Sequence, residues 1–260
     1  MHTEIISFLA TNPGAGGAAA TASTGDSLVI KNNRGVAGPR VIDWWGFNQT
    51  AGFQQCTYPS GHDTTRGFRV GAIVDDTYSF LAEGTSLPVT AQETLTITLA
   101  GSAASTDMGS MLVWYPDLPG VDQRALTWSQ FQDRYEKLTT VFASLTTGSI
   151  AQYGAGVAIN AGSDLLLANR DYALLGISTT ADCLAVCLVG PDTGYARIGC
   201  PGSNQNSDEA AQYFARISRA QGKALIPVVN SGNKSATLLS AIGTSAAAIN
   251  ATLNLALLRK

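Results

Sequence analysis

Most of this chain consists of short runs in which apolar and polar residues alternate, separated by turns rich in Gly, Pro, Asn and Asp. Successive side chains of a strand point to opposite faces, so such alternation is typical of half-buried strands. Near the C-terminus, for example, Leu253, Leu255 and Leu257 alternate with smaller or polar residues. Many short strands with few helices predict an all-β fold built of antiparallel sandwiches. The predicted strands are 3–9, 26–31, 40–48, 66–74, 93–99, 109–115, 150–159, 164–168, 171–178, 183–190, 194–199, 223–229, 235–241 and 250–258.

Two segments carry helical signals instead. The pattern Thr127–Gln130 is a capping box, and apolar residues then recur at spacings of three and four from Phe131 to Leu145. This predicts one helix over 127–145. A second helix is expected over 208–221, with acids at its start and Gly222 as its C-terminal stop. Its inward residues would be Tyr213, Phe214 and Ile217.

The same layout is repeated along the chain at an offset near 130 residues, half of the 260-residue length. The segment 75–84 in the first half corresponds in position to the second helix. Both segments are followed by an X-Pro-Val sequence. A period this long indicates two similar domains rather than a solenoid. Chance similarity among strands of one composition is the alternative. The matching pairs are 25–32 with 162–169, 40–47 with 170–177, 68–71 with 196–199, 87–89 with 226–228, and 94–99 with 252–257.

The repeat sets the expected domain boundaries. The first sandwich covers 1–125 and includes an N-terminal loop or arm over 13–24, and the second covers 146–260. The helix within 126–145 would connect or flank them. Superposition of the two halves should align Gly46 with Gly176.

Only 13% of the residues are charged, about half the usual share for a soluble domain, and the net charge is −3. Charge keeps monomers apart, so this surface is poorly protected against association. The alternative is an ordinary secreted protein whose surface consists of small polar side chains. No cluster of Lys or Arg is available to neutralise phosphates, so direct nucleic-acid binding is not expected.

Candidate chemistry is sparse. The two histidines, His2 and His62, are too few for a metal site of the kind found in β-barrels. Residues 59–63 are interpreted as a polar turn, since adjacent residues of an extended chain point apart. We therefore expect no catalytic residue, no metal and no cofactor. A calcium-binding role of Asp75, Asp76 or Asp192 stays open. Alternatively, Asp75 and Asp76 are acids at the start of a helix and Asp192 belongs to an ordinary turn.

The four cysteines do not have the spacing of a zinc site. They are interpreted as small buried apolar residues, and their redox state is left open. They are Cys56, Cys183, Cys187 and Cys200.

The aromatic pair Trp44 and Trp45 places one ring on each face of its strand. Core or interface packing is favoured, because the matching pair in the second half is aliphatic. The candidate interface anchors are Trp44, Trp45, Phe47 and Phe53. A sugar platform formed by Trp44, Trp45 and Tyr58 is the alternative.

The segments 213–218, 225–230 and 250–258 resemble late strands of a virion jelly roll. Together with two tandem sandwich halves and few charges, they make the chain similar in layout to the double jelly-roll major capsid proteins of icosahedral viruses, including bacteriophages. The resemblance implies a homotrimer of pseudo-hexagonal outline that tiles a virion shell, with other virion proteins as partners. Such shells often enclose an internal membrane, which is a further candidate partner. The alternatives are a carbohydrate- or receptor-binding β-sandwich of a virion or secreted protein, and a hydrolase with paired carboxylates in a cleft.

Overall fold

The computed structural model describes the second half of the chain in most detail, and in the first half it describes mainly the backbones of strands. Two compact units are formed, one by residues 1–119 with 150–152 and the other by 120–149 with 153–260. The described elements are mostly antiparallel β-strands, as expected from the alternation. In the second half the described residues are 124–148, 152–162, 165–180, 183, 185–195, 197–201, 210–243 and 245–260.

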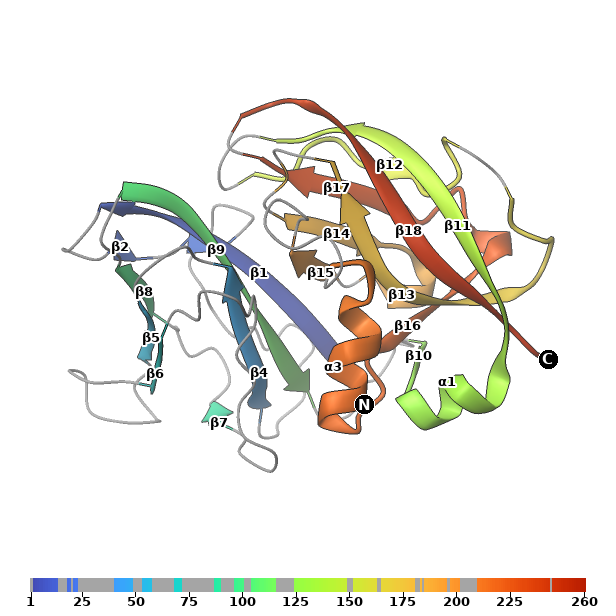
Figure 1. Cartoon of the computed structure of the whole chain (residues 1–260), viewed down its shortest axis with the longest axis horizontal. Coiled ribbons are helices and arrows are strands. Elements are labelled where there is room, and N and C mark those ends of the chain that lie inside the picture. The colour runs from blue at the N-terminus through green and yellow to red at the C-terminus, as the bar shows by residue number, and fades with distance from the viewer. Residues whose placement is uncertain are drawn as a thin grey trace. The chain divides into compact units, whose positions relative to one another are not determined.

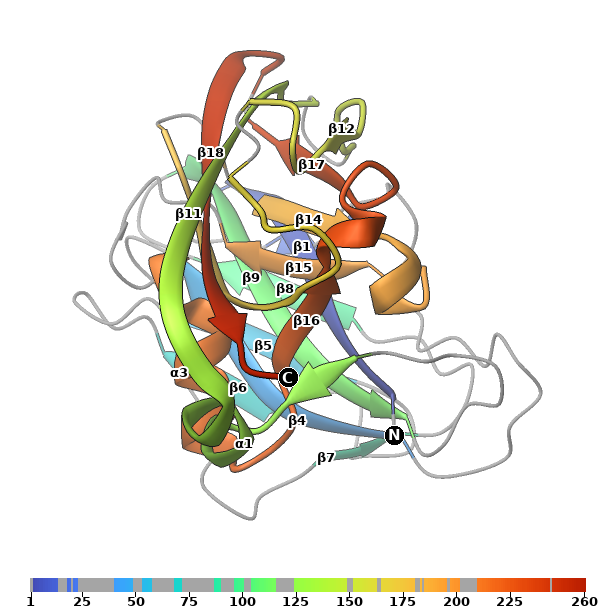
Figure 2. The same cartoon turned by 90° about the vertical axis from the view of Figure 1, so that its right-hand side faces the viewer.

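The second unit contains two antiparallel sheets, with strands ordered β10-β16-β13-β18-β11 and β12-β17-β14-β15 (Figures 1 and 2). Two helices, α1 (Trp128–Arg134) and α3 (Tyr213–Gln221), accompany them. Two single-turn 3₁₀ helices, η1 (Pro191–Thr193) and η2 (Ser231–Asn233), lie in turns between strands. The strands are β10 (Ala125–Leu126), β11 (Tyr135–Thr146), β12 (Val157–Ala158), β13 (Asp171–Thr179), β14 (Ala185–Val189), β15 (Ile198–Pro201), β16 (Ile226–Asn230), β17 (Leu238–Ile242) and β18 (Ala248–Leu258).

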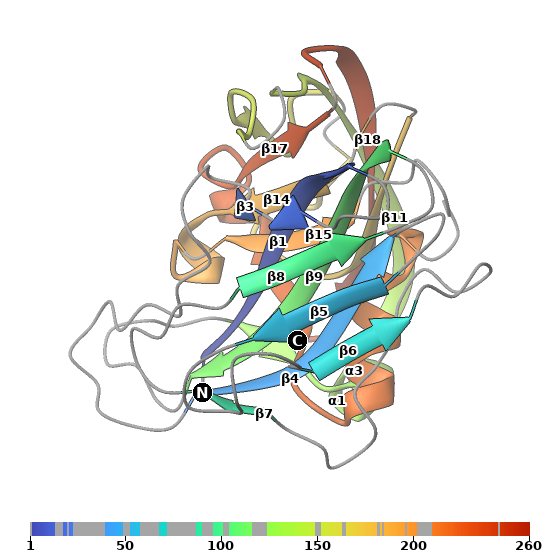
Figure 3. The same cartoon turned by 90° about the vertical axis from the view of Figure 1, so that its left-hand side faces the viewer.

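The first unit pairs its strands in the orders β1-β9-β4-β7 and β2-β8-β5-β6, and β3 pairs additionally with β1 (Figure 3). All of these pairings are antiparallel. The strands are β1 (His2–Pro13), β2 (Ala18–Ala19), β3 (Thr21–Ala22), β4 (Arg40–Asn48), β5 (Phe53–Thr57), β6 (Phe68–Gly71), β7 (Leu87–Val89), β8 (Thr96–Ala100) and β9 (Ala104–Tyr115).

The two units share one strand order. If β3 and β10 are set aside and the other eight strands of each unit are numbered along the chain, both units pair as 1-8-3-6 and 2-7-4-5. Gly46 and Gly176 lie in the third strands, β4 and β13, and each of these carries a one-residue bulge where it pairs with the eighth strand. The 87–89 and 226–228 segments lie in the sixth strands, and 68–71 and 198–201 form the fifth strands.

One proposed match between the halves is wrong. Residues 96–99 belong to β8, the seventh strand of its unit, whereas 252–257 belong to β18, the eighth. The seventh strand of the second unit is β17. Alternation of Thr and Leu is a general property of half-buried strands, so it could not distinguish one strand from another.

The helix expected over 126–145 is also corrected. The capping box is confirmed, because Thr127 Oγ1 accepts from the Gln130 amide and Gln130 Oε1 accepts from the Thr127 amide. The helix nevertheless ends at Arg134, and Tyr135–Thr146 is strand β11 of the second unit. Val141, Ala143 and Leu145 are buried at every second position, and β-branched residues precede them, so pairing with β18 determines the structure.

Other expectations vary in outcome. The helix expected over 208–221 is present over 213–221 as α3, with Gly222 as its left-handed C-cap and Tyr213, Phe214 and Ile217 buried. No strand forms at 165–168, and the 13–24 arm contains β2 and β3. Of the strand predicted over 150–159, only 157–158 is strand among the described residues. The segments 26–31, 75–84 and 208–209 lie outside the described residues.

The outer face of the β16-β13-β18 sheet is covered by helices. Phe131 of α1 and Leu126 of β10 pack with Ala173, Val228 and Leu258. The segment leading into α3 lies so close to β13 that a Cβ on Gly176 would come 2.2 Å from the Ala210 carbonyl oxygen. Only glycine fits this crossing, which explains the residue at the centre of the repeat. The uncovered part of this sheet face lies on β11 and β18.

Candidate functional site

The uncovered outer face of β11 and β18 is the most distinctive surface in the described part of the second unit. Alternation along β11 buries its odd-numbered residues from Val141 onwards and turns the even-numbered residues outward. Leu138 is 63% exposed and Phe142 is 49% exposed. The β11 face, as we call it, is made of Leu138, Thr140, Phe142, Ser144 and Thr146 of β11 and Ala248, Asn250, Thr252 and Asn254 of β18.

None of the nine side chains of the β11 face carries a charge, and most are small. Directly opposite residues of the two strands, such as Phe142 with Thr252 and Ser144 with Asn250, lie side by side along this surface. A sheet face exposed to water normally carries charged residues, as on edge strands that must resist association. The β11 face therefore lacks the charged side chains that oppose association.

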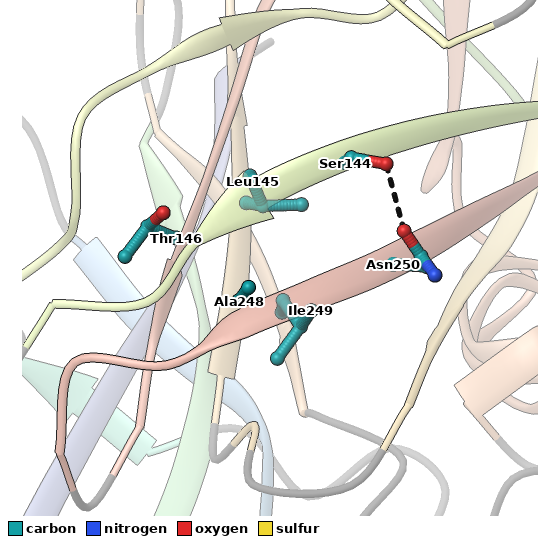
Figure 4. A pocket seen from close by; sticks show the side chains of 6 residues that line it. All are labelled: Ser144, Leu145, Thr146, Ala248, Ile249 and Asn250. Atoms are coloured by element: carbon teal, nitrogen blue, oxygen red, sulfur yellow. Dashed lines mark hydrogen bonds between the residues drawn. The ribbon is translucent and has the colours of Figure 1, made fainter.

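A shallow depression of about 320 Å³ lies at one end of this face, between the end of β11 and the start of β18 (Figure 4). It is lined by Ser144, Leu145, Thr146, Ala248, Ile249 and Asn250. The Ser144 hydroxyl donates to Asn250 Oδ1 at 2.7 Å. None of the six lining side chains titrates, so the depression offers no base to activate the serine and no general acid.

A polar cluster joins the turns at one end of the second unit. Arg124 donates to Asp171 at 2.5 and 3.1 Å and to Asp192 at 3.2 Å. Asn230 donates from its side chain to Asp171 at 2.7 Å and from its backbone to Asp192 at 2.9 Å. Asn233 adds a third donor to Asp192, at 3.0 Å. The cluster therefore ties the starts of β10 and β13 to η1, the end of β16 and η2.

The electrostatics of this cluster fit a structural role. Burial alone raises the pKa of Asp171, but hydrogen bonds from Arg124 and Asn230 and the charge of Arg124 outweigh it, so the pKa lies below its ordinary value. The hydrogen bond to Asp171 is the main cause of a raised pKa for Arg124. The Asp171 carboxylate is held ionised by its donors, which is the opposite of what a proton-transfer residue needs.

The calcium hypothesis at Asp192 is weakened by the same contacts. Asp192 is 5% exposed, and its two carboxylate oxygens accept from a guanidinium and two amides. These donors occupy the lone pairs that a cation would use. No group of three or more potential metal-ligating His, Cys, Asp or Glu residues occurs among the described residues.

Three cysteines are buried and form no disulfide bond, as their interpretation as small apolar residues requires: Cys183, Cys187 and Cys200. Burial raises the pKa of Cys187 and, more strongly, that of Cys200. A thiol that resists ionisation is a poor nucleophile, so neither supports a reactive-cysteine site. Cys56 lies in β5, where the side chain is outside the described residues.

The interface anchors expected from the sequence lie in strands of the first unit. Trp44, Trp45 and Phe47 belong to β4 and Phe53 begins β5, and their side chains lie outside the described part of the chain. Tyr58 and His62 lie outside it entirely, as do Asp75 and Asp76. These assignments stay predictions.

Leu138 and Phe142 were missed as surface residues, because the helical spacing assigned them to a buried stripe. A second signal was present in the sequence. From Val141 to Leu145 every second residue, Val141, Ala143 and Leu145, is apolar, and Thr140, Ser144 and Thr146 lie among the residues between and beside them. Counting both periods would have left the two structures equally supported.

Comparison with known proteins gives no assignment, since no protein-family model and no curated protein matches the chain. Within the described residues, neither helix has the length and apolarity needed to cross a membrane.

Proposed function

We propose that this chain is a structural, non-enzymatic protein of a virion, a double jelly-roll major capsid protein that forms trimers in an icosahedral shell. The observation that carries the proposal is the strand order 1-8-3-6 and 2-7-4-5 in each of two units. Pairing of strand 1 with 8, 2 with 7, 3 with 6 and 4 with 5 is the pattern obtained by winding one long hairpin around a sandwich. That winding is the jelly roll, a fold frequent in capsids and lectins.

The duplication supports the capsid class over a lectin. A lectin needs one sandwich and one binding face, whereas three copies of a chain with two similar units supply six similar units to a ring. Such a ring has a nearly hexagonal outline and can pack into a continuous layer. Closed homo-oligomers of this kind use cyclic symmetry, in which each copy contributes the same surfaces.

The β11 face supports self-association. β11 is the edge strand of its sheet, and an edge strand with exposed Leu138 and Phe142 is an aggregation risk unless another surface covers it. Small side chains lose little conformational entropy when they are buried, so the cost of association is low. We propose that a second copy covers this face, in an interface above about 2,000 Å² per pair of subunits, the size typical of obligate assemblies.

The test is the mass of the purified full-length chain at micromolar concentration and ordinary salt, by light scattering coupled to size exclusion, with negative-stain images of the same fractions. The expected mass is close to three times the 27.0 kDa of one chain, or that of a larger shell. A stable monomer, together with the absence of particles in the native source, would refute the proposal. That outcome would favour a carbohydrate- or receptor-binding module.

A further inference from the structure

We draw no further inference here: the strongest candidate, the depression between the end of β11 and the start of β18, belongs to the β11 face already described, and nothing in the structure shows what occupies it.

Discussion

Gly176 shows how a single residue fixes the placement of a helix on a sheet. The backbone at Ala210 and Ala211 occupies the space where a side chain at position 176 would stand, with Ala211 atoms at 2.5 and 2.6 Å from an added Cβ. Since those neighbours are backbone atoms, they cannot rotate away. This contact explains glycine at position 176, whereas the surroundings of its counterpart Gly46 lie outside the described residues.

We predict that Gly176→Ala lowers the free energy of unfolding by about 2 kcal/mol or more, because the backbone of residues 210–211, just before α3, must shift away from β13. Urea denaturation followed by circular dichroism measures this. Gly222→Ala is the comparison: nothing lies within 4 Å of its added Cβ, and only its φ of +64° opposes the change. That costs about 1–2 kcal/mol. A Gly176→Ala protein as stable as the wild type would mean that residues 210–211 do not lie against Gly176.

Asp171 predicts a specific dependence of stability on pH. Its pKa in the folded chain is lowered relative to the ordinary value, so its contribution to stability is complete above the unfolded-state pKa of about 3.9. The contribution is lost as the pH falls through the lower, folded-state pKa. Asp171→Asn should cost about 1–3 kcal/mol at pH 7, where Arg124 loses its charged partner, and much less near pH 2.

Unfolding free energies measured from pH 7 to pH 2 check this prediction. The control is Asp133→Asn, on an exposed position of α1, which should stay within about 0.5 kcal/mol of the wild type. An unchanged difference between wild type and Asp171→Asn across the whole range would contradict the pKa assignment.

At the scale of elements, the segment from Thr127 to Thr146 separates what the sequence determines locally from what it does not. The capping box is a contact between residues three apart, so its outcome was predictable. Beyond Arg134, helical and strand periods fit the same residues, and pairing with β18, more than a hundred residues further along the chain, decides between them. The Arg124 cluster was not predictable for a similar reason, since its members are 47 and 68 residues apart.

The strand assignment of 135–146 predicts opposite effects on stability for substitutions at two positions of β11. Val141 is fully buried and Leu138 is 63% exposed, whereas the helical stripe would bury Leu138. Val141→Ala should therefore cost about 2 kcal/mol of unfolding free energy. Leu138→Ala should cost less than about 0.5 kcal/mol. Thermal and urea unfolding of the two variants measures both values. A larger loss of unfolding free energy for Leu138→Ala than for Val141→Ala would favour the helical assignment of this segment.

At the scale of the whole molecule, the strand order provides an argument that no individual segment could. Matching of short segments between the halves was right for the third, fifth and sixth strands and wrong for the seventh and eighth. The strand order repeats in all eight positions, because pairing depends on the whole pattern of burial and turns. The shared strand order supports the capsid proposal, although the expected aromatic anchors lie in the first unit and the β11 face in the second.

The β11 face gives the most direct test of how copies of the chain associate. Introducing a carboxylate on this face, at its end by Leu138→Glu or at its centre by Phe142→Glu, would force an unpaired charge into the proposed interface. Desolvation of that charge should weaken association at least tenfold, while the chain itself stays folded because both positions are exposed. Ala220→Glu, on the exposed side of α3, adds the same charge elsewhere and should leave association unchanged. Light scattering over a dilution series measures the midpoint of dissociation for each protein. Equal midpoints for all of them would place the contact between copies on another surface, and the aromatic residues of β4 and β5 would become the next positions to change.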